Sequence, residues 1–186
     1  MNKREKTLSS VRQIDPRAKR DTVVFRKPVS SDGAAVWELI AACKPLDENS
    51  MYCNLIQCDH FRDTCILAAK DGEPLGWISA YILPYDPETL FVWQVAVSEK
   101  ARGLGLGKRM LAGLLERDEC KGVARLQTTI TRDNDASWGL FKSFARQQEA
   151  QLDAQAHFTR DTHFRGYHAT EHMVTIKLPE ALKKAA

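Results

Sequence analysis

The stretch Arg102-Gly-Leu-Gly-Leu-Gly-Lys108 is the part of the sequence best suited to holding a phosphate. It follows an apolar run and precedes an amphipathic one, which predicts a strand, a glycine-rich turn and then a helix. Such a turn offers an anion free backbone N–H groups and the positive end of the helix dipole. Gly103, Gly105 and Gly107 allow the main chain to approach a pyrophosphate, and Arg102 and Lys108 add positive charge.

The spacing of this loop argues against two common nucleotide sites. A P-loop has Gly five positions before its Gly-Lys pair and Ser or Thr after it, whereas here these positions hold Arg102 and Arg109. A dinucleotide fold has G-x-G-x-x-G early in a βαβ unit, whereas this G-x-G-x-G comes late in the chain, after several expected strands. An ordinary glycine-rich turn remains the alternative to a phosphate site.

The elements that must position this loop are predicted from periodicity and turn signals. We expect an order of strand, two helices, three strands, helix, strand, helix and strand, which is a mixed α/β sheet. The expected strands are 22–26, 64–69, 75–83, 90–97, 123–130 and 174–178. The expected helices are 32–43, capped by Ser31 or Asp32, one through 51–56, capped by Asn49 or Ser50, one from 105, and 134–146.

Three details complete this prediction. Asp71-Gly72 predicts a hairpin turn between the second and third strands. Pro84 and Pro87 are expected to bracket a loop, and residues 151–167 have no clear period. The run 90–97 is apolar almost throughout, as in a central strand buried on both faces.

Length and composition suit one domain. The 186 residues are 44% hydrophobic and 27% charged, and we expect a disordered basic tail over 1–21, a domain over 22–178 and a C-terminal tail over 179–186. The net charge of +3 resides in the tail, which has seven Lys or Arg and three acids, leaving 20 against 21 elsewhere. This balance argues against nucleic acid. No membrane span or signal segment is present, so a cytoplasmic protein is expected.

The cysteines and histidines give no sign of a metal or a disulfide framework. Five cysteines are an odd number without a C-x-x-C pair, so we expect reduced thiols. No cysteine or carboxylate set completes a zinc site with His163, His168 and His172, and no metal is expected.

The loop from Arg102 to Gly107 resembles the [Q/R]-x-x-G-x-[G/A] motif of the GNAT acetyltransferase superfamily. The resemblance implies a GNAT fold, with a mixed sheet of six to seven strands flanked by about four helices. It also implies acetyl-CoA as cosubstrate, with a bulge in the preceding strand whose backbone pairs with pantetheine. The implied cofactor-binding residues are Val95, Ala96, Val97, Arg102, Gly103, Leu104, Gly105, Leu106, Gly107, Lys108 and Asn134. Asn134 has the alternative role of a helix N-cap.

One position departs from the superfamily. Many members carry a Tyr on the last helix that protonates the leaving thiolate, and the matching dipeptide here is Leu140-Phe141. Phe donates no proton, so the acid is dispensable or comes from Tyr52 or water. The general acid stays unassigned.

Further strings resemble one branch of the superfamily, the diaminobutyrate N-acetyltransferases of ectoine biosynthesis. They include 45–53, 60–65, 79–81, 91–97, 128–131 and 168–172, and the likeness extends over residues 24–178. It implies acetylation of 2,4-diaminobutyrate at N4 and a homodimer. In this fold the connection between the two early helices lies over the acceptor site, which places Asp47 and Glu48 near an ammonium group.

The other acceptor-site candidates are Tyr52, Trp93, His168 and Glu171. Trp93 suits a pocket wall that packs against a cation, and His168 or Glu171 suits amine binding or proton relay, so Trp93, Glu171 and His168 are also the catalytic candidates. The structural alternatives are a helix cap for Asp47, core positions for Tyr52 and Trp93, and plain surface for His168 and Glu171.

The expected mechanism is direct attack of the amine on the thioester in a ternary complex, with backbone N–H groups of 95–97 stabilising the oxyanion. A route through Cys53 or Cys65 is the covalent alternative. The alternative functions are acetylation of another small amine, polyamine or peptide N-terminus, and a catalytically silent acetyl-CoA-binding module.

Overall fold

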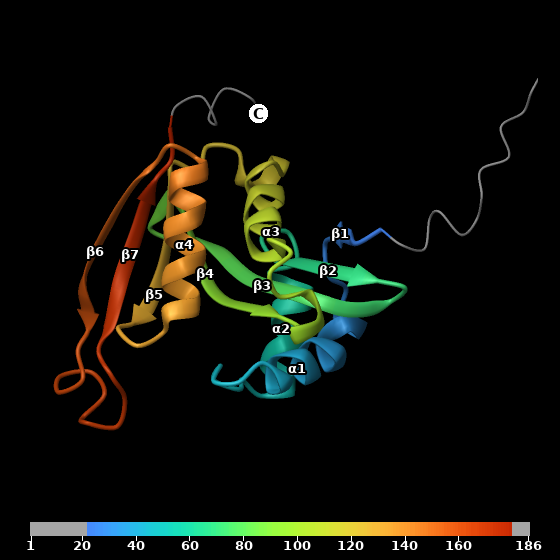
Figure 1. Cartoon of the computed structure of the whole chain (residues 1–186), viewed down its shortest axis with the longest axis horizontal. Helices are drawn as coiled ribbons and strands as arrows, with labels where there is room; N and C mark the ends of the chain where they lie inside the picture. Colours follow the sequence, from blue (N-terminus) through green and yellow to red (C-terminus); the bar gives the residue numbers. More distant parts are fainter. Residues whose placement is uncertain (1–21, 180–186) are drawn as a thin grey trace, which may run out of the picture.

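The computed structural model describes residues 22–179 as a twisted sheet with helices on both faces (Figure 1). The basic tail expected at 1–21 and residues 180–186 of the expected C-terminal tail lie outside the described residues. The strands are β1 (Val24–Arg26), β2 (Ile66–Lys70), β3 (Glu73–Leu83), β4 (Asp86–Val97), β5 (Arg125–Thr131), β6 (Gln151–Phe158) and β7 (Glu171–Lys177). The helices are α1 (Gly33–Ala42), α2 (Met51–His60), α3 (Leu106–Leu115) and α4 (Asp135–Gln147), with short 3-10 turns at Ser30–Asp32, Glu99–Ala101 and Asp118–Cys120.

The seven strands form one mixed sheet in the order β1-β2-β3-β4-β5-β7-β6. All neighbours are antiparallel except β4 and β5, which are parallel. Seven strands and four α-helices confirm the expected fold class.

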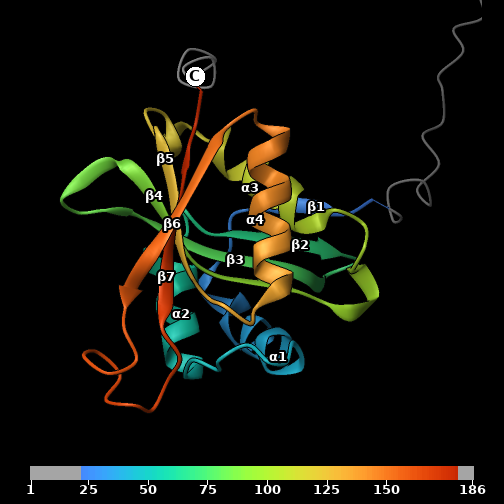
Figure 2. The same ribbon diagram turned by 60° about the vertical axis from the view of Figure 1, so that its left-hand side comes forward.

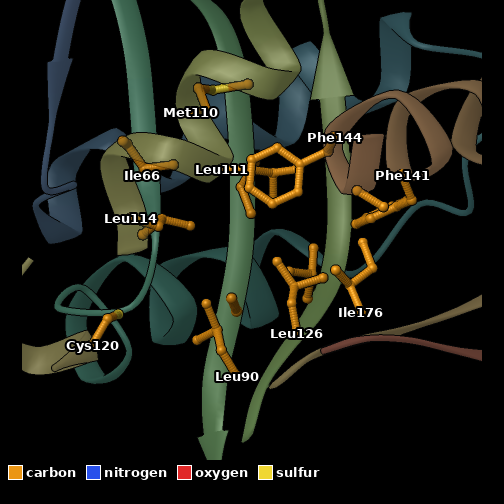
Figure 3. Close-up of a cluster of buried hydrophobic side chains, with 14 of the residues drawn as sticks. Ile66, Leu90, Met110, Leu111, Leu114, Cys120, Leu126, Phe141, Phe144 and Ile176 are labelled. Carbon is orange, nitrogen blue, oxygen red and sulfur yellow. The ribbon is translucent and has the colours of Figure 1, made fainter. Parts of the chain in front are cut away.

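Two hydrophobic layers flank the sheet because neighbouring side chains of a strand point to opposite faces. Ile66 and Ile78 pack with α3 and α4, whereas Leu67 and Trp77 pack with α1. The larger cluster is shown in Figure 3, where Met110, Leu111 and Leu114 of α3 meet Phe141 and Phe144 of α4 over Leu90 and Leu126. These layers fix α3 and α4 against the middle of the sheet.

Local sequence signals account for several element ends. Asp71 and Gly72, at the β2–β3 turn, have φ of 51° and 86°, which confirms the expected tight hairpin. Of the two caps considered for α2, the structure has Ser50, whose hydroxyl accepts a hydrogen bond from Cys53 N at 3.1 Å. The helix after the glycine loop begins as predicted.

Three predictions of elements were incomplete or wrong. Residues 151–158 form β6, although no element was predicted there, and β7 begins at Glu171 rather than at 174. Pro87 lies within β4 and not in a loop, because the turn after β3 is confined to Pro84 and Tyr85. Pro87 precedes the part of β4 that pairs with β5, so its missing N–H leaves that ladder intact.

The parallel pair at the centre of the sheet is short. β4 pairs with β5 only at Thr89, Leu90 and Phe91. Beyond this point β4 continues along β3 to Val97, and β5 continues along β7 to Thr131. The two strands therefore separate, and one edge of β4 becomes free from about residue 92 onward.

Candidate functional site

A β-bulge lies where β4 leaves β5. Ser79 of β3 is opposite Gln94 and Ala80 is opposite Val92, so Trp93 has no cross-strand partner. The bulge expected at 95–97 is thus centred on Trp93, and residues 95–97 themselves pair regularly with β3. A bulge adds one residue to one strand and shifts the alternation of everything after it.

The shifted alternation sets which backbone groups reach the open edge. Ser98 N donates to Leu75 O at 2.9 Å, which makes this a hydrogen-bonded pair with β3. In an antiparallel ladder such pairs alternate with non-hydrogen-bonded pairs, whose N–H and C=O groups point away from the partner strand. Val95 and Val97 are of the second kind, so their N–H groups point into the opening between β4 and β5.

The glycine loop follows directly and has two glycines in the left-handed region. Gly103 has φ of 77° and Gly105 has φ of 66°, and a Cβ at either position would meet nothing within 4 Å. Gly105 is the N-cap of α3, and the bond from Arg109 N to Gly105 O at 3.1 Å is the first of that helix. The N–H groups of Leu106, Gly107 and Lys108 therefore have no acceptor within the helix and suit a pyrophosphate.

The third glycine also has a packing role that the sequence did not predict. Gly107 is buried, and a Cβ there would lie 3.0 Å from a methyl group of Leu140 on α4. Its missing side chain allows α3 and α4 to pack closely, and its backbone N–H is still one of the three without an acceptor in the helix.

The polar residues around the loop are spread over several elements. Lys108 Nζ donates to Ser143 Oγ on α4 at 3.1 Å, and Arg102 is exposed beside the thiol of Cys43. Leu104 is exposed. Asn134 is the N-cap of α4, where its side-chain oxygen accepts from Ser137 N at 3.0 Å. The capping role considered for Asn134 is therefore present.

Three acceptor-site candidates come together although they lie on different segments. His168 Nε2 is 3.8 Å from an oxygen of Asp47 and 3.9 Å from Glu171 Oε1. His168 Nδ1 lies 2.8 Å from Ala169 O. Because a carbonyl oxygen can only accept a hydrogen bond, Nδ1 carries the proton and donates it. In neutral His168 this leaves Nε2 as an acceptor between two carboxylates. Figure 2 shows the α1–α2 connection and the β6–β7 loop at the same end of the molecule.

Glu171 is the most buried of these three groups, with 18% of its side chain exposed. Burial raises its pKa above the ordinary value, an effect that Asp47 reinforces and that His168 and the Thr129 hydroxyl oppose. Its Oε2 is buried and accepts no hydrogen bond of ordinary geometry from the described residues. An acceptor without a donor is costly inside a protein, so this oxygen suits a cationic ligand.

Asp47 does not cap α2, because Ser50 does, and 93% of its side chain is exposed. Glu48 pairs instead with Lys44. Tyr52 and Trp93 are 71% and 48% exposed, which excludes the core positions considered for both. Trp93 follows Val92, which points into the α3–α4 layer, so its side chain lies on the opposite face.

The structure adds Gln94, a residue that the sequence analysis did not single out. Its Nε2 donates to Asp47 O at 2.8 Å, and Asn49 Nδ2 donates to its Oε1 at 3.4 Å. The available signal was its place as the one polar side chain in the run 90–97.

No acid for the leaving group is found at the position of the family Tyr. Phe141 is 2% exposed and packs in the core, so neither its chemistry nor its location suits proton transfer. Tyr52, on α2, is an exposed phenol.

The cysteines give no support to a covalent route. All five are unpaired, and burial raises the pKa of Cys53 and raises that of Cys65 to about 12. A thiol nucleophile is activated by a lowered pKa, which neither residue has.

Residues 22–179 lack two features. This part of the chain contains no group of three or more His, Cys, Asp or Glu that could hold a metal ion. None of its helices is long and apolar enough to cross a membrane.

Comparison with known proteins adds a family and a set of relatives. Residues 34–145 match the Acetyltransferase (GNAT) family. The chain is 45% identical over 154 residues to the L-2,4-diaminobutyric acid acetyltransferase of Methylotuvimicrobium alcaliphilum, covering 83% of this chain and 90% of the relative. It is also 45% identical to the Vibrio cholerae enzyme of the same name, covering 83% and 90%.

A solved structure has a similar fold. Diaminobutyrate acetyltransferase EctA from Paenibacillus lautus, in complex with L-2,4-diaminobutyric acid and coenzyme A, matches with a TM-score of 0.80 and 39% identity over 84% of this chain and 95% of that one. A ribosomal-protein-alanine N-acetyltransferase from Brucella melitensis matches with a TM-score of 0.63 and 18% identity over 84% and 99%, a likeness of fold alone.

Proposed function

The chain belongs to the GNAT acetyltransferase family and, within it, to the L-2,4-diaminobutyric acid acetyltransferases, and from this premise we propose that it transfers the acetyl group of acetyl-CoA to L-2,4-diaminobutyrate. The product is N4-acetyl-L-2,4-diaminobutyrate, the precursor that cyclises to ectoine. The observation that carries the proposal is the 39% identical EctA structure, which was solved with this substrate and coenzyme A.

The residues on the cofactor side fit acetyl-CoA. Gly103 and Gly105 leave open space above the loop, and the unpaired N–H groups of the first turn of α3 would donate to the pyrophosphate, with Arg102 and Lys108 adding charge. The backbone of Val95, Ala96 and Val97 lies along the open edge of β4 and suits the pantetheine arm. Leu104, Leu106 and Gly107 complete the loop, and Asn134 lies at the start of α4.

The residues on the acceptor side fit a diamine. The carboxylates of Asp47 and Glu171 lie 3.8 Å and 3.9 Å from His168 Nε2, which is a third acceptor when His168 is neutral, and an ammonium group has three N–H donors. Trp93 and Tyr52 are exposed near this segment, and Trp93 suits packing against the cation or the methylene chain.

The proposed chemistry is direct transfer in a ternary complex. The ammonium loses one proton to Glu171 or His168, and the amine nitrogen attacks the thioester carbon to give a tetrahedral intermediate. The C–S bond then breaks, and the second proton on nitrogen passes to the departing thiolate through water or a weak acid. The N–H groups of Val95 and Val97 donate to the oxyanion that develops on the thioester carbonyl. The CoA thiolate leaves readily because the pKa of a thiol is about 8.5, so a weak acid such as Tyr52 or water suffices.

We also propose that residues 22–178 act as one domain, in the cytoplasm and as a homodimer. The continuous sheet supports one domain, and five unpaired cysteines support a reducing compartment. β6 pairs only with β7, so its outer backbone groups are available to a second copy. Sedimentation velocity measures the oligomer directly, and a monomer at micromolar concentration would contradict the dimer.

The first experiment measures free CoA thiol released from acetyl-CoA with 2,4-diaminobutyrate, ornithine, lysine, spermidine, a peptide N-terminus or buffer, followed by NMR of the product. Preference for diaminobutyrate with the acetyl group on N4 is expected. Turnover that favours another amine would refute the substrate while keeping the family, and CoA binding without turnover of any amine would indicate a silent module.

A further inference from the structure

Gln94 is a polar side chain on an otherwise apolar strand, and the bulge explains where it points. Val92 lies in the α3–α4 layer, and the hydrogen bonds of Gln94 lie on the opposite face. Because Trp93 is the extra residue, Trp93 and Gln94 are two consecutive side chains directed to the acceptor side.

Both ends of the Gln94 amide bind the segment between α1 and α2. Its NH2 group donates to the Asp47 carbonyl at 2.8 Å, and its oxygen accepts from the Asn49 side chain at 3.4 Å. Turning the amide over would put donor against donor and acceptor against acceptor. The two partners therefore fix one orientation of Gln94.

These bonds matter because Asp47 has little else to hold it. Residues 47–50 have no helical or strand structure, and the exposed Asp47 carboxylate has His168 Nε2 as a neighbour at 3.8 Å. Among the described residues, Gln94 makes the hydrogen bonds that join 47–49 to the sheet. The position of the Asp47 carboxylate thus depends on the backbone, and that backbone depends on Gln94.

Gln94 also adjoins the groups that face the thioester. Val95 follows it directly and points its N–H into the opening between β4 and β5. The strand that positions the acetyl group therefore also positions, through one side chain, a carboxylate that binds the acceptor. The distance from the backbone of β4 to the backbone of Asp47 is set by the length of the Gln94 side chain and its two hydrogen bonds.

We propose that Gln94 is a positioning residue that sets the distance between the acetyl group and the Asp47 carboxylate, and thereby selects the chain length of the diamine. The proposal rests on the proposed function and extends it to specificity. It predicts that loss of the Gln94 amide weakens binding of the acceptor, leaves binding of acetyl-CoA unchanged, and relaxes discrimination against longer diamines.

The test compares Gln94→Met, which keeps the length of the side chain and removes both hydrogen bonds, with Gln127→Met as matched control. Gln127 lies on β5 and donates to Thr175 Oγ1 at 3.1 Å, away from the 47–49 segment. For Gln94→Met we expect KM for diaminobutyrate to rise about 10-fold, with KM for acetyl-CoA changed by less than about 2-fold. The ratio of kcat/KM for ornithine to that for diaminobutyrate should rise at least about 5-fold, because one methylene is discriminated by about 10–200-fold in a fitted pocket.

Several results would overturn the inference. An unchanged ornithine ratio contradicts it, and so does an equal rise in KM for acetyl-CoA, which indicates general distortion of β4. If Gln94→Met does not fold, as judged by loss of stabilisation by acetyl-CoA, Asn49→Ala replaces it and is expected to change the same ratio in the same direction by less. If the wild-type protein does not acetylate diaminobutyrate, the proposed function is refuted. This outcome is distinct from failure of the Gln94 inference because it is seen without any substitution.

Discussion

Asp32 and Glu171 are two carboxylates with opposite hydrogen-bonding environments. Asp32, at the start of α1, accepts two hydrogen bonds from Arg26 and one from Val29 N, all at 2.7 Å, and Arg26 lowers its pKa. Glu171, at the start of β7, has one oxygen 3.9 Å from His168 and the other buried without an ordinary hydrogen bond, and burial raises its pKa. The first charge is neutralised by the fold and the second is left for a ligand.

The difference separates a residue that stabilises the protein from one that does chemistry. A carboxylate whose acceptors are all used contributes to folding, whereas a buried carboxylate with a free acceptor costs stability until a cation binds. Substitutions at these two positions should therefore have opposite effects on activity and on stability.

The largest expected effect is on turnover. Glu171→Gln should lower kcat/KM for diaminobutyrate by about 100-fold, because a hydrogen bond to a charged group contributes about 1.5–3 kcal/mol. Steady-state kinetics at saturating acetyl-CoA measures this. Activity within about 3-fold of wild type would remove Glu171 from the site.

The next effect is on stability. Asp32→Asn should lower the free energy of unfolding by about 1–2 kcal/mol, discounted because Arg26 is partly exposed, and should leave kcat/KM within about 2-fold. Urea unfolding followed by circular dichroism measures the first quantity. A large loss of activity with unchanged stability would reverse the contrast with Glu171.

The pH dependences should also be opposite. The pKa of Asp32 is lower folded than unfolded, so its contribution to stability is present above its unfolded pKa of about 3.9 and is lost as pH falls through its folded pKa. The pKa of Glu171 is raised when folded, so its ionisation costs stability as pH rises above its ordinary value of 4.5.

The raised pKa of Glu171 should also appear in the pH profile of kcat/KM. As the pH falls, kcat/KM should decrease at a pH above 4.5, because protonated Glu171 neither binds ammonium nor accepts a proton. Glu171→Gln should remove that decrease, and Asp32→Asn should keep it. Identical profiles in wild type and Glu171→Gln would assign the decrease to another group.

The smallest expected effect is a gain. At pH 8 without substrate, Glu171→Gln should raise Tm by about 1–2 °C, equivalent to about 0.5 kcal/mol in a domain of this size. Differential scanning calorimetry measures it. A lower Tm would mean that Glu171 stabilises the folded protein, contrary to this prediction.

The sequence predicted the fold well where local signals were strong. Asp71-Gly72 marked the first hairpin, Ser50 was one of two caps considered for α2, and the run 90–97 marked the central strand. β6 was missed although Gln151–Phe158 alternates polar and apolar residues, because Ala, Gln and Asp have low strand propensity and most of the strand is exposed.

The site was predicted less completely, for a physical reason. The glycine loop is contiguous in the chain, so its chemistry was visible, but the close approach of Gly107 to Leu140 requires the packing of two helices. The bulge depends on the register with β3, and Gln94 acquires its partners only when residues 47–49 fold over β4. Asp47, His168 and Glu171 were named as candidates, whereas their mutual distances depend on the tertiary fold.

The order of segments in the acceptor site has a consequence for how activity is lost. Asp47 comes from near one end of the described chain and His168 and Glu171 from the other, whereas the coenzyme loop is one continuous stretch after β4. Contacts distant in sequence carry the larger loop-closure entropy and open first when they involve few buried groups. β6 is the edge strand of the sheet and pairs with β7. Local unfolding of the β6–β7 hairpin is expected to abolish acetyl transfer while coenzyme binding persists. Mild denaturant should therefore inactivate the protein before it unfolds.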